Sequence, residues 1–435
     1  MLEGKPSAEI RDLPEPEILH VPIFSRRLSF DDARVEDGQD VAEGQVLAVD
    51  PANFGTALLA PRAGTVRLDA AARHLTIENP KPATDAAVDD SVSGTEALVR
   101  LGAWPYFADA ATGDVPDPAA PPKAIVVTTI HLDAFLVRGD VQLSGALDAF
   151  GEGLGLLHSL AGDAAFHLVV PRLSSELASR IKELTGKLSW LQALEVDVRY
   201  PFGNCKLAAE QLGLGEQSPV WTLGVEGVLA VAAALGDSKP CLSRVISIGG
   251  PAAAKAIHAR VVPGYPIEAI RSSYVEGDPV RIVNGGALSG AALGDEQHGV
   301  DVECLGLTML PENTEREFLA FAQPGFGKHA FTRTFASVLR PMFRERYSTA
   351  VRGEPRPCVQ CGSCSRACAA GLTPFLIAHL ADRKRLDDAA GIGLGKCLNC
   401  GLCSYVCLSK RENSQTIFDA IDTYRKEQAA LVEQA

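Results

Sequence analysis

Two short runs near the carboxyl end of the chain repeat one spacing of cysteines. The first, CVQCGSCSRAC, spans residues 358–368, and the second, CLNCGLCSYVC, spans residues 397–407. Each has the pattern C-x2-C-x2-C-x3-C, in which three closely spaced thiolates can hold one corner of an iron–sulfur cube. In proteins with two such cubes, the fourth cysteine of each run ligates the other cluster. The pattern therefore predicts two [4Fe–4S] clusters with crossed ligands.

This crossing assigns a ligand set to each cluster. The alternative is a pair of zinc ribbons, which also use C-x2-C pairs, but zinc does not require the third and fourth cysteines at these offsets in both copies. Clustered cysteines in a reducing compartment indicate metal ligands rather than disulfides. The predicted ligands are Cys358, Cys361, Cys364 and Cys407 for cluster one, and Cys397, Cys400, Cys403 and Cys368 for cluster two.

The residues around the ligands agree with this prediction in one respect and depart from the ferredoxin pattern in another. Gly362 and Gly401 follow the second cysteine of their runs, where the backbone must pass close to a cluster. Ala369 and Leu408 stand where the ferredoxin run usually has proline. The ligands are intact, so we expect the clusters to assemble with altered turns after the fourth cysteines. The other cysteines are expected to be buried thiols: Cys205, Cys241 and Cys304.

Helices are expected to hold these runs. Thr373 can cap a helix whose first turn contains Pro374, and another helix is expected after Asn413 or Ser414. The apolar stripe of that last helix indicates ordinary packing more than a partner site; it consists of Ile417, Ile421, Tyr424 and Leu431. Residues 346–435 are therefore predicted to form an α-helical ferredoxin domain with two [4Fe–4S] clusters.

Length and charge limit the remaining function classes. A chain of 435 residues predicts two to four domains. Its net charge of −13 argues against a nucleic-acid partner. The first twenty residues lack the apolar region of a secretory signal, and no stretch reaches the 18 apolar residues of a spanning helix. We expect a chain without its own transmembrane segment, in contact with a membrane only through partner subunits.

The segment before residue 82 alternates short β-rich runs with glycine turns. Its phrases VAEGQVLAVD and APRAGTV resemble the barrel-sandwich hybrid of lipoyl and biotinyl domains. Those carriers attach their cofactor to a lysine at a hairpin tip, and no lysine lies between Val49 and Leu59. Residues 1–82 are therefore expected to form such a barrel without a swinging arm, used for structure or docking.

Residues 83–255 are predicted to form a Rossmann-like α/β domain, because apolar runs at 125–129, 166–171, 194–201 and 244–251 alternate with helical patterns. FGEGLG, with Gly151, Gly153 and Gly155, lies inside a helical pattern and lacks the dinucleotide fingerprint. Residues 256–345 are expected to form a second β-rich domain and a helical linker that begins in PENTEREFLAF. His329, between Lys328 and Arg333, is expected to make a surface contact.

Taken in order, several phrases resemble the NqrA family, which is the A subunit of the sodium-translocating NADH:quinone reductase. They are AIVVTTIHLDAF, YPFGNCKLA, VWTLGVEGVLAVAAAL, SRVISIGGP, RIVNGGALSG and REFLAFAQPGFGKHAFTRTF. Residues 350–410 are instead similar to the cluster module of the C subunit of the Rnf complex and of related corrin reductases. The resemblance implies that residues 256–345 hold a β-grasp domain of the SLBB type. It also implies a peripheral subunit on the cytoplasmic side of the inner (cell) membrane.

The resemblance implies partners that hold flavins and span the membrane, in an Nqr- or Rnf-type complex. FMN, NADH and quinone are ligands of these families, but no motif in this chain supports them: the GGAGFP-like and CEPY-like phrases of the Rnf-type members are missing. The sequence therefore favours an electron-transfer subunit that relays electrons through two clusters, with no catalytic residue of its own. The alternatives are an NADH dehydrogenase subunit using FMN, and an assembly subunit with structural clusters.

Overall fold

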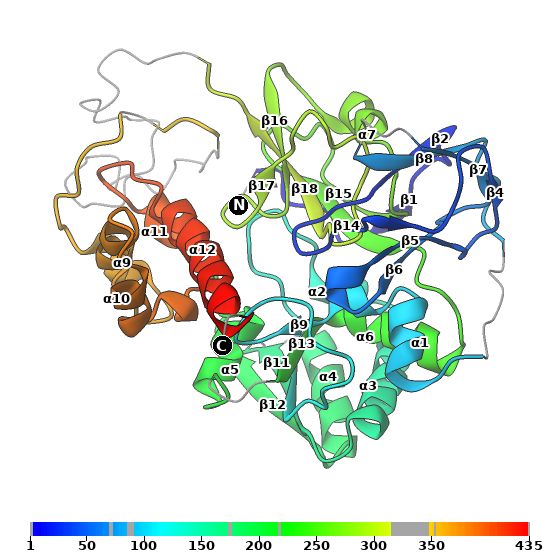
Figure 1. Cartoon of the computed structure of the whole chain (residues 1–435), viewed down its shortest axis with the longest axis horizontal. Coiled ribbons are helices and arrows are strands. Elements are labelled where there is room, and N and C mark those ends of the chain that lie inside the picture. The colour runs from blue at the N-terminus through cyan, green and yellow to red at the C-terminus, as the bar shows by residue number, and fades with distance from the viewer. Residues whose placement is uncertain are drawn as a thin grey trace.

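The computed structural model describes residues 3–68, 73–84, 91–172, 176–215, 219–314, 348–351 and 354–433. Figure 1 shows a body built on four sheets and, at one side of it, a lobe of helices drawn in orange and red. The architecture is thus mixed α/β with a helical carboxyl-terminal region. The part of PENTEREFLAF after Thr314, and the segment with Lys328, His329 and Arg333, lie outside the described residues.

Two small antiparallel sheets form from the glycine-rich segment near the amino end. Apolar side chains at alternating positions fill the space between them, and Leu19, Leu47 and Ile77 are fully buried. One sheet contains β2 (Ile18–Pro22), β8 (His74–Glu78), β7 (Gly64–Leu68) and β4 (Asp40–Val41), and the other contains β3 (Asp32–Ala33), β5 (Val46–Asp50) and β6 (Thr56–Leu59).

The turn between β5 and β6 is fixed by one buried carboxylate. Asp50 is fully buried and accepts hydrogen bonds from the backbone amides of Ser29 at 2.8 Å and Asn53 at 3.1 Å. Phe54 follows in the left-handed region, with φ 62°, and its side chain is 44% exposed. The residues of this turn include no lysine.

The middle of the chain forms a parallel sheet with helices on both faces. Every residue of β10 (Ala124–Thr128) is buried, as expected for a central strand of such a sheet. Ile125 packs in the core with α3 (Leu147–Ala161) and α6 (Val225–Val231), whereas Val126 packs with α5 (Cys205–Gln211) on the other face. The strand order is β12 (Leu191–Val196), β11 (Ala165–Pro171), β10, β13 (Val220–Gly224) and the antiparallel β9 (Ala108–Asp109).

The strand expected at 194–201 begins three residues earlier and ends five residues earlier, at Leu191–Val196. It pairs with β11 in a register that matches Phe166 with Leu191 and Pro171 with Val196. The amide of Arg172, directly after β11, still donates to the carbonyl oxygen of Val196 at 2.8 Å, and both strands end at this bond.

The glycines of FGEGLG lie within α3, as their pattern predicts. A Cβ atom on Gly153 would collide with the carbonyl oxygen of Val228 in α6, whereas one on Gly155 would meet no atom within 4 Å. Gly153 therefore allows α3 and α6 to approach closely. This packing role accounts for Gly153 without any bound nucleotide.

A six-stranded sheet completes the body beneath α7 (Ile267–Tyr274). Its core contains Ile246, Ile248, Ile257 and Met309, all at most 1% exposed. The strand order is β1 (Ile10–Asp12), β15 (Ile257–Val261), β14 (Arg244–Gly249), β18 (Gly306–Pro311), β16 (Val280–Asn284) and β17 (Ala291–Ala292).

Two strands of this sheet come from outside the range 256–345. β1, within residues 1–82, pairs in parallel with β15, and β14, within residues 83–255, pairs with both β15 and β18. The expected sequence ranges and the sheets therefore divide the body differently, because pairing brings together strands that are far apart along the chain.

The carboxyl-terminal lobe is helical and has its own small core. Ile377 and Ile417 lie at its centre. The expected helices after Thr373 and around Asn413 are confirmed, but the apolar stripe of the last one ends near Tyr424, since Leu431 is 59% exposed. The helices are α8 (Ser363–Ala367), α9 (Pro374–Ala381), α10 (Leu386–Gly391), η5 (Leu394–Lys396), α11 (Leu402–Tyr405) and α12 (Asn413–Glu433).

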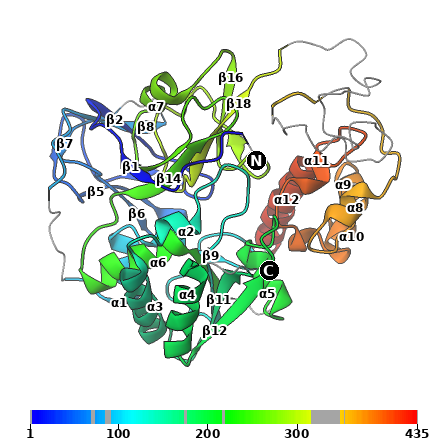
Figure 2. The ribbon, with the colours of Figure 1, turned by 180° about the vertical axis from the view of Figure 1, so that it is seen from behind.

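The lobe stands on the same side of the body as α5 and β17, and both views show the carboxyl end of α12 close to α5 (Figure 2). Within the described part of the chain, no helix combines the length and the apolar content that crossing a membrane requires.

Candidate iron–sulfur centre

The two cysteine runs adopt the same backbone. Gln360 and Asn399, between the first two cysteines of each run, have φ values of 53° and 49°. Gly362 and Gly401 have φ values of 70° and 73°, and a short helix begins directly after each of them. These left-handed residues, at matching positions, reverse the direction of the backbone within each run. The repeated spacing of the sequence is therefore a repeated loop in space.

Backbone amides within these loops point at sulfur atoms. The amide of Gln360 donates to Sγ of Cys358, that of Asn399 to Sγ of Cys397, and that of Arg411 to Sγ of Cys407, each at 3.4 Å. Amide donors stabilise thiolate sulfur, and hydrogen bonds to sulfur are among the features that set cluster potentials. The loops thus fit iron–sulfur ligation by their backbone as well as by their cysteines.

The fourth cysteine of run one lies with the sulfurs of run two. Burial, with smaller contributions from the nearby thiols of Cys397 and Cys368, raises the pKa of Cys400 to about 11. Burial also raises the pKa of Cys397, and the nearby Cys368 thiol adds to this increase. α8 and α11 contact each other, which brings the ends of the two runs together. This is the proximity that crossed ligation requires.

Cys403 belongs to the same neighbourhood. Burial raises its pKa to about 12, with smaller contributions from Cys397, Cys400 and, from run one, Cys364. Among the described residues, no three His, Cys, Asp or Glu side chains gather closely enough to hold a single metal ion. The ligands of an iron–sulfur cube need not gather in that way, because each thiolate binds a different iron atom.

The two runs differ in exposure. Cys358 and Cys361 of run one are exposed, whereas the four cysteines of run two are partly buried. A hydrogen bond with the Ser363 hydroxyl lowers the pKa of Cys361. The same loop is therefore open to solvent in one copy and covered in the other.

What covers run two is the parallel-sheet part of the body. The Tyr200 hydroxyl donates to the carbonyl oxygen of Cys400 at 2.8 Å, and Nζ of Lys206 donates to the carbonyl oxygen of Gly395 at 2.6 Å. Burial raises the pKa of Tyr200 and lowers that of Lys206. Each is a long polar side chain whose tip satisfies a carbonyl of the helical lobe.

A loop of the six-stranded sheet also contacts run two. Gly401 lies so close to the carbonyl oxygen of Leu288 that a Cβ atom there would collide with it. Asp133 supports this loop, since its carboxylate accepts from the amide of Ser289 at 2.9 Å and from its hydroxyl at 2.6 Å. Burial raises the pKa of Asp133, and these hydrogen bonds oppose that effect.

Two protein-family models match parts of the chain. Residues 90–237 match the model described as the NqrA second alpha/beta domain, and residues 357–410 match the 4Fe-4S dicluster domain. The parallel-sheet part of the body is thus similar to one domain of NqrA, and the helical lobe is similar to dicluster domains. All eight predicted ligands lie within the dicluster match, and Tyr200 and Lys206 lie within the NqrA domain.

The similarity to NqrA extends over most of the chain. The A subunit of the Na(+)-translocating NADH-quinone reductase of Aliivibrio salmonicida is 26% identical over 412 residues, which cover 91% of this chain and 90% of the relative. The protein of the same name from Shewanella amazonensis is 25% identical with the same coverage. That of Pasteurella multocida is 25% identical over 454 residues, with 98% of this chain and 97% of the relative covered.

Among solved structures, the NAD+-reducing [NiFe]-hydrogenase in its air-oxidized state aligns with 90% of this chain and 83% of that chain. The identity is 10% and the TM-score is 0.40, which is too low to support an argument about the fold.

Sequence reasoning did not single out Tyr200 or Lys206 as site residues. Both stand in YPFGNCKLA, a phrase that carries the NqrA resemblance, and that resemblance was the only signal available for them. Their partners lie about two hundred residues further along the chain, so no local spacing could connect them to the clusters.

The three remaining cysteines do not join the dicluster domain. Cys304 is buried, and Cys205 and Cys241 are partly buried. Burial raises the pKa of each thiol to about 12, so all three stay protonated at neutral pH.

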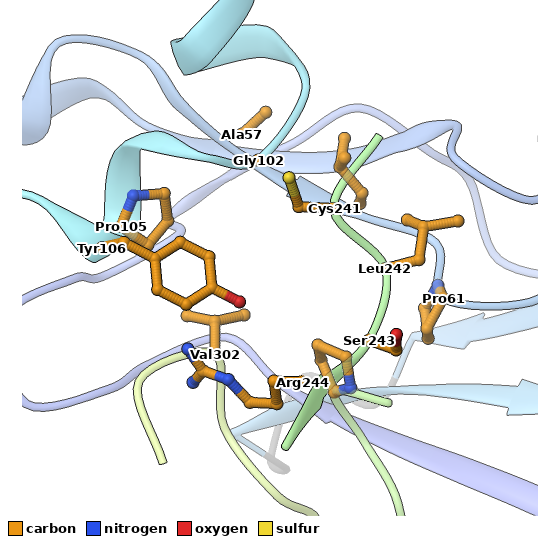
Figure 3. Close-up of a pocket in the computed structure, with 12 residues that line it drawn as sticks. Ala57, Pro61, Gly102, Pro105, Tyr106, Cys241, Leu242, Ser243, Arg244 and Val302 are labelled. Carbon is orange, nitrogen blue, oxygen red and sulfur yellow. The ribbon is translucent and has the colours of Figure 1, made fainter. Parts of the chain in front are cut away.

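A small cavity lies elsewhere, where the NqrA second domain meets β6 and β14. Its volume is about 30 Å³, which holds about two water molecules. Figure 3 shows the Tyr106 hydroxyl pointing into it beside Arg244, whose guanidinium carbon lies 4.9 Å from the Tyr106 ring centre. Nη1 of Arg244 is buried without a hydrogen-bond partner in the described part of the chain. Water in this space can supply that partner.

Proposed function

We propose that this chain is the electron-transfer subunit of an NADH:quinone reductase and carries electrons through two [4Fe–4S] clusters. The observation that carries the proposal is the doubled cysteine loop, docked by run two onto an NqrA-like body. Such clusters supply one-electron transfer when bound. The chain itself supplies thiolates, amide donors to sulfur and a fixed separation between two loops.

The ligand assignment forms part of the proposal. The proximity of Cys368 to Cys397 and Cys400 supports a crossed arrangement, with the fourth cysteine of each run on the opposite cluster. The proposed sets are Cys358, Cys361, Cys364 and Cys407 for cluster one, and Cys397, Cys400, Cys403 and Cys368 for cluster two.

We also propose four domains: a barrel-sandwich hybrid at 1–82, a Rossmann-like domain at 83–255, a β-grasp domain with a linker at 256–345, and the ferredoxin domain at 346–435. The two small antiparallel sheets and the parallel sheet support the first two assignments. β1 and β14 belong to the third domain by pairing, although they precede it in sequence.

Membrane-embedded and flavin-bearing subunits are the proposed partners, with this chain as a peripheral subunit on the cytoplasmic side. The names of the relatives support a place in such a complex. The electron acceptor is then supplied by those partners, and Tyr200 and Lys206 hold the helical lobe against the body.

The test is optical. The full chain, purified anaerobically, should contain about eight irons, as expected for two four-iron clusters. Its visible absorbance should bleach with dithionite and stay unchanged with NADH alone. Bleaching by NADH would instead favour the FMN-dependent dehydrogenase, and clusters that resist dithionite would favour the structural role.

Substitution tests the ligand role directly. Cys361→Ala should reduce the iron content to about four per chain, since it opens one cluster and leaves the other. Electron transfer from dithionite through the assembled complex should then fall to background. Cys241→Ala is the control, because that thiol lies outside both runs; turnover that survives Cys361→Ala would contradict the relay.

A further inference from the structure

The two cysteine runs are alike in backbone but unequal in surroundings. On run two, Gly401 meets Leu288 of the body, and the Cys400 carbonyl accepts from Tyr200. At the matching position of run one, a Cβ atom on Gly362 would meet only the Arg366 guanidinium, a flexible group, at 3.3 Å. Run two therefore faces inward, and run one has no equivalent contact among the described residues.

Apolar side chains next to the predicted ligands of cluster one are exposed to solvent. Val359, between Cys358 and Cys361, is 67% exposed. Leu408, directly after Cys407, is 38% exposed and replaces the proline of the ferredoxin pattern. These two residues flank predicted ligands of cluster one, so a partner that reaches those ligands also meets apolar surface.

The charge of this surface is positive, although the chain as a whole has a net charge of −13. Residues 355–368 and 402–411, which carry the cluster one ligands, contain no acidic residue. One of their four cations, Arg411, pairs with Asp382 at 2.6 Å. The acidic residues Glu354 and Glu412 directly precede the first segment and directly follow the second. The four cations are Arg356, Arg366, Lys410 and Arg411.

The two segments lie side by side. The amide of Arg356 donates to the carbonyl oxygen of Ser409 at 2.8 Å, and the Ser409 hydroxyl donates to that of Pro357 at 3.0 Å. We call the surface formed by Arg356, Val359, Arg366 and Leu408 the cluster-one face. It combines exposed predicted ligands, two exposed apolar side chains and two cations.

We propose that the cluster-one face is the docking site for a one-electron carrier protein whose redox cofactor lies beneath an acidic surface. This inference rests on the proposed function. Electron transfer weakens steeply with distance, so a partner must reach the ligands that stand at the surface, and Cys358 and Cys361 do so. Cationic residues around them attract an acidic partner and orient it.

The step involves one electron only. The partner's cofactor is oxidised by one electron, the chain is reduced by one, and no bond or proton changes place. The electron enters beside Cys358 and Cys361 and reaches the body at run two, where Tyr200 and Lys206 hold the lobe.

The experiment uses the full chain with its clusters and two probe proteins: reduced flavodoxin, which is acidic and carries FMN, and cytochrome c, which is basic. Arg356→Glu and Arg356→Glu/Arg366→Glu reverse charges on the cluster-one face. Lys187→Glu, at the exposed end of α4 (Glu176–Lys187), is the matched control. Iron content and the visible spectrum are checked first; Arg356→Glu leaves intact the hydrogen bond from Arg366 to the Cys361 carbonyl.

We expect the double reversal to lower the rate and affinity of flavodoxin association about tenfold at low salt, with the difference lost at high salt. Affinity is read calorimetrically, independently of turnover. Equal binding by wild type and double variant, equal loss in Lys187→Glu, or preference of the wild type for cytochrome c would each overturn the proposal. In those cases dithionite still reduces the clusters, so the relay stands; failure of dithionite itself would refute the relay.

Discussion

Lys206 brings a positive charge to run two from outside the dicluster domain. It lies in α5, donates to carbonyl oxygens of Ala111 and Gly395, and interacts with the Cys397 thiol. A nearby cation stabilises the more negative, reduced state of a cluster. Lys206→Met should therefore lower the midpoint potential of cluster two, measured by redox titration with EPR. Lys396→Met is the control, since that amine is about half exposed and solvent screens it. An unchanged midpoint potential in Lys206→Met would mean that the amine only holds the helical lobe in place through its hydrogen bonds.

His131 gives the folded chain a pH dependence. Burial lowers its pKa from 6.5 to about 4, so the folded state holds it neutral where the unfolded state binds a proton. Its contribution to stability is thus fully present above pH 6.5 and is lost as the pH falls toward 4. We expect the urea midpoint to fall between pH 6.5 and 5, and His131→Asn to flatten this fall. If His131→Asn leaves the pH dependence of the urea midpoint unchanged, other titrating groups cause that dependence.

At the residue scale, local spacing predicted what is local. The eight cysteines and the glycines after the second cysteine of each run were evident because one loop repeats its own sequence. Tyr200, Lys206 and Asp133 were not, because their role depends on segments that meet only after folding. Nothing in a single sequence marks a tyrosine whose partner is a distant carbonyl.

At the element scale, α3 offers a matched pair of glycines. Gly153→Ala should destabilise the chain by about 2 kcal/mol or more, because the added methyl collides with the Val228 carbonyl and the helices must separate. Gly155→Ala, in the same helix with open space beside it, should stabilise by about 0.5–1 kcal/mol through helix propensity. Urea unfolding followed by far-UV circular dichroism measures both. Equal effects of the two changes would contradict the close α3–α6 contact.

Strand positions show how far periodicity reaches. The expected strands at 125–129 and 166–171 lie within a residue of β10 and β11, since continuous apolar runs suit a sheet covered on both faces. The strand expected at 194–201 was displaced because its limits follow from pairing with β11 and not from its own composition. The apolar character of a segment predicts that a strand exists; its neighbour decides where the strand ends.

At the scale of the whole molecule, one glycine tests how the lobe docks. Gly401→Ala and Gly362→Ala impose the same backbone strain of about 1–2 kcal/mol, since both residues have φ near +70°. Only the methyl at 401 also meets the Leu288 carbonyl. We expect Gly401→Ala to increase hydrogen exchange in residues 395–405 and in the loop near residue 288, with little change there in Gly362→Ala. The same exchange pattern in both variants would indicate strain alone.

The pairing of β1 with β15 has a consequence for how the chain is made. Residues 10–12 leave the ribosome early, but their partner, residues 257–261, emerges only after more than half of the chain has been synthesised. Until then, the sheet that carries the Leu288 loop is incomplete, and the iron-binding runs follow later still. The clusters should thus be inserted after the body has folded. A tag or truncation that disturbs residues 10–12 should therefore weaken the docking of the dicluster domain, although that domain is synthesised last.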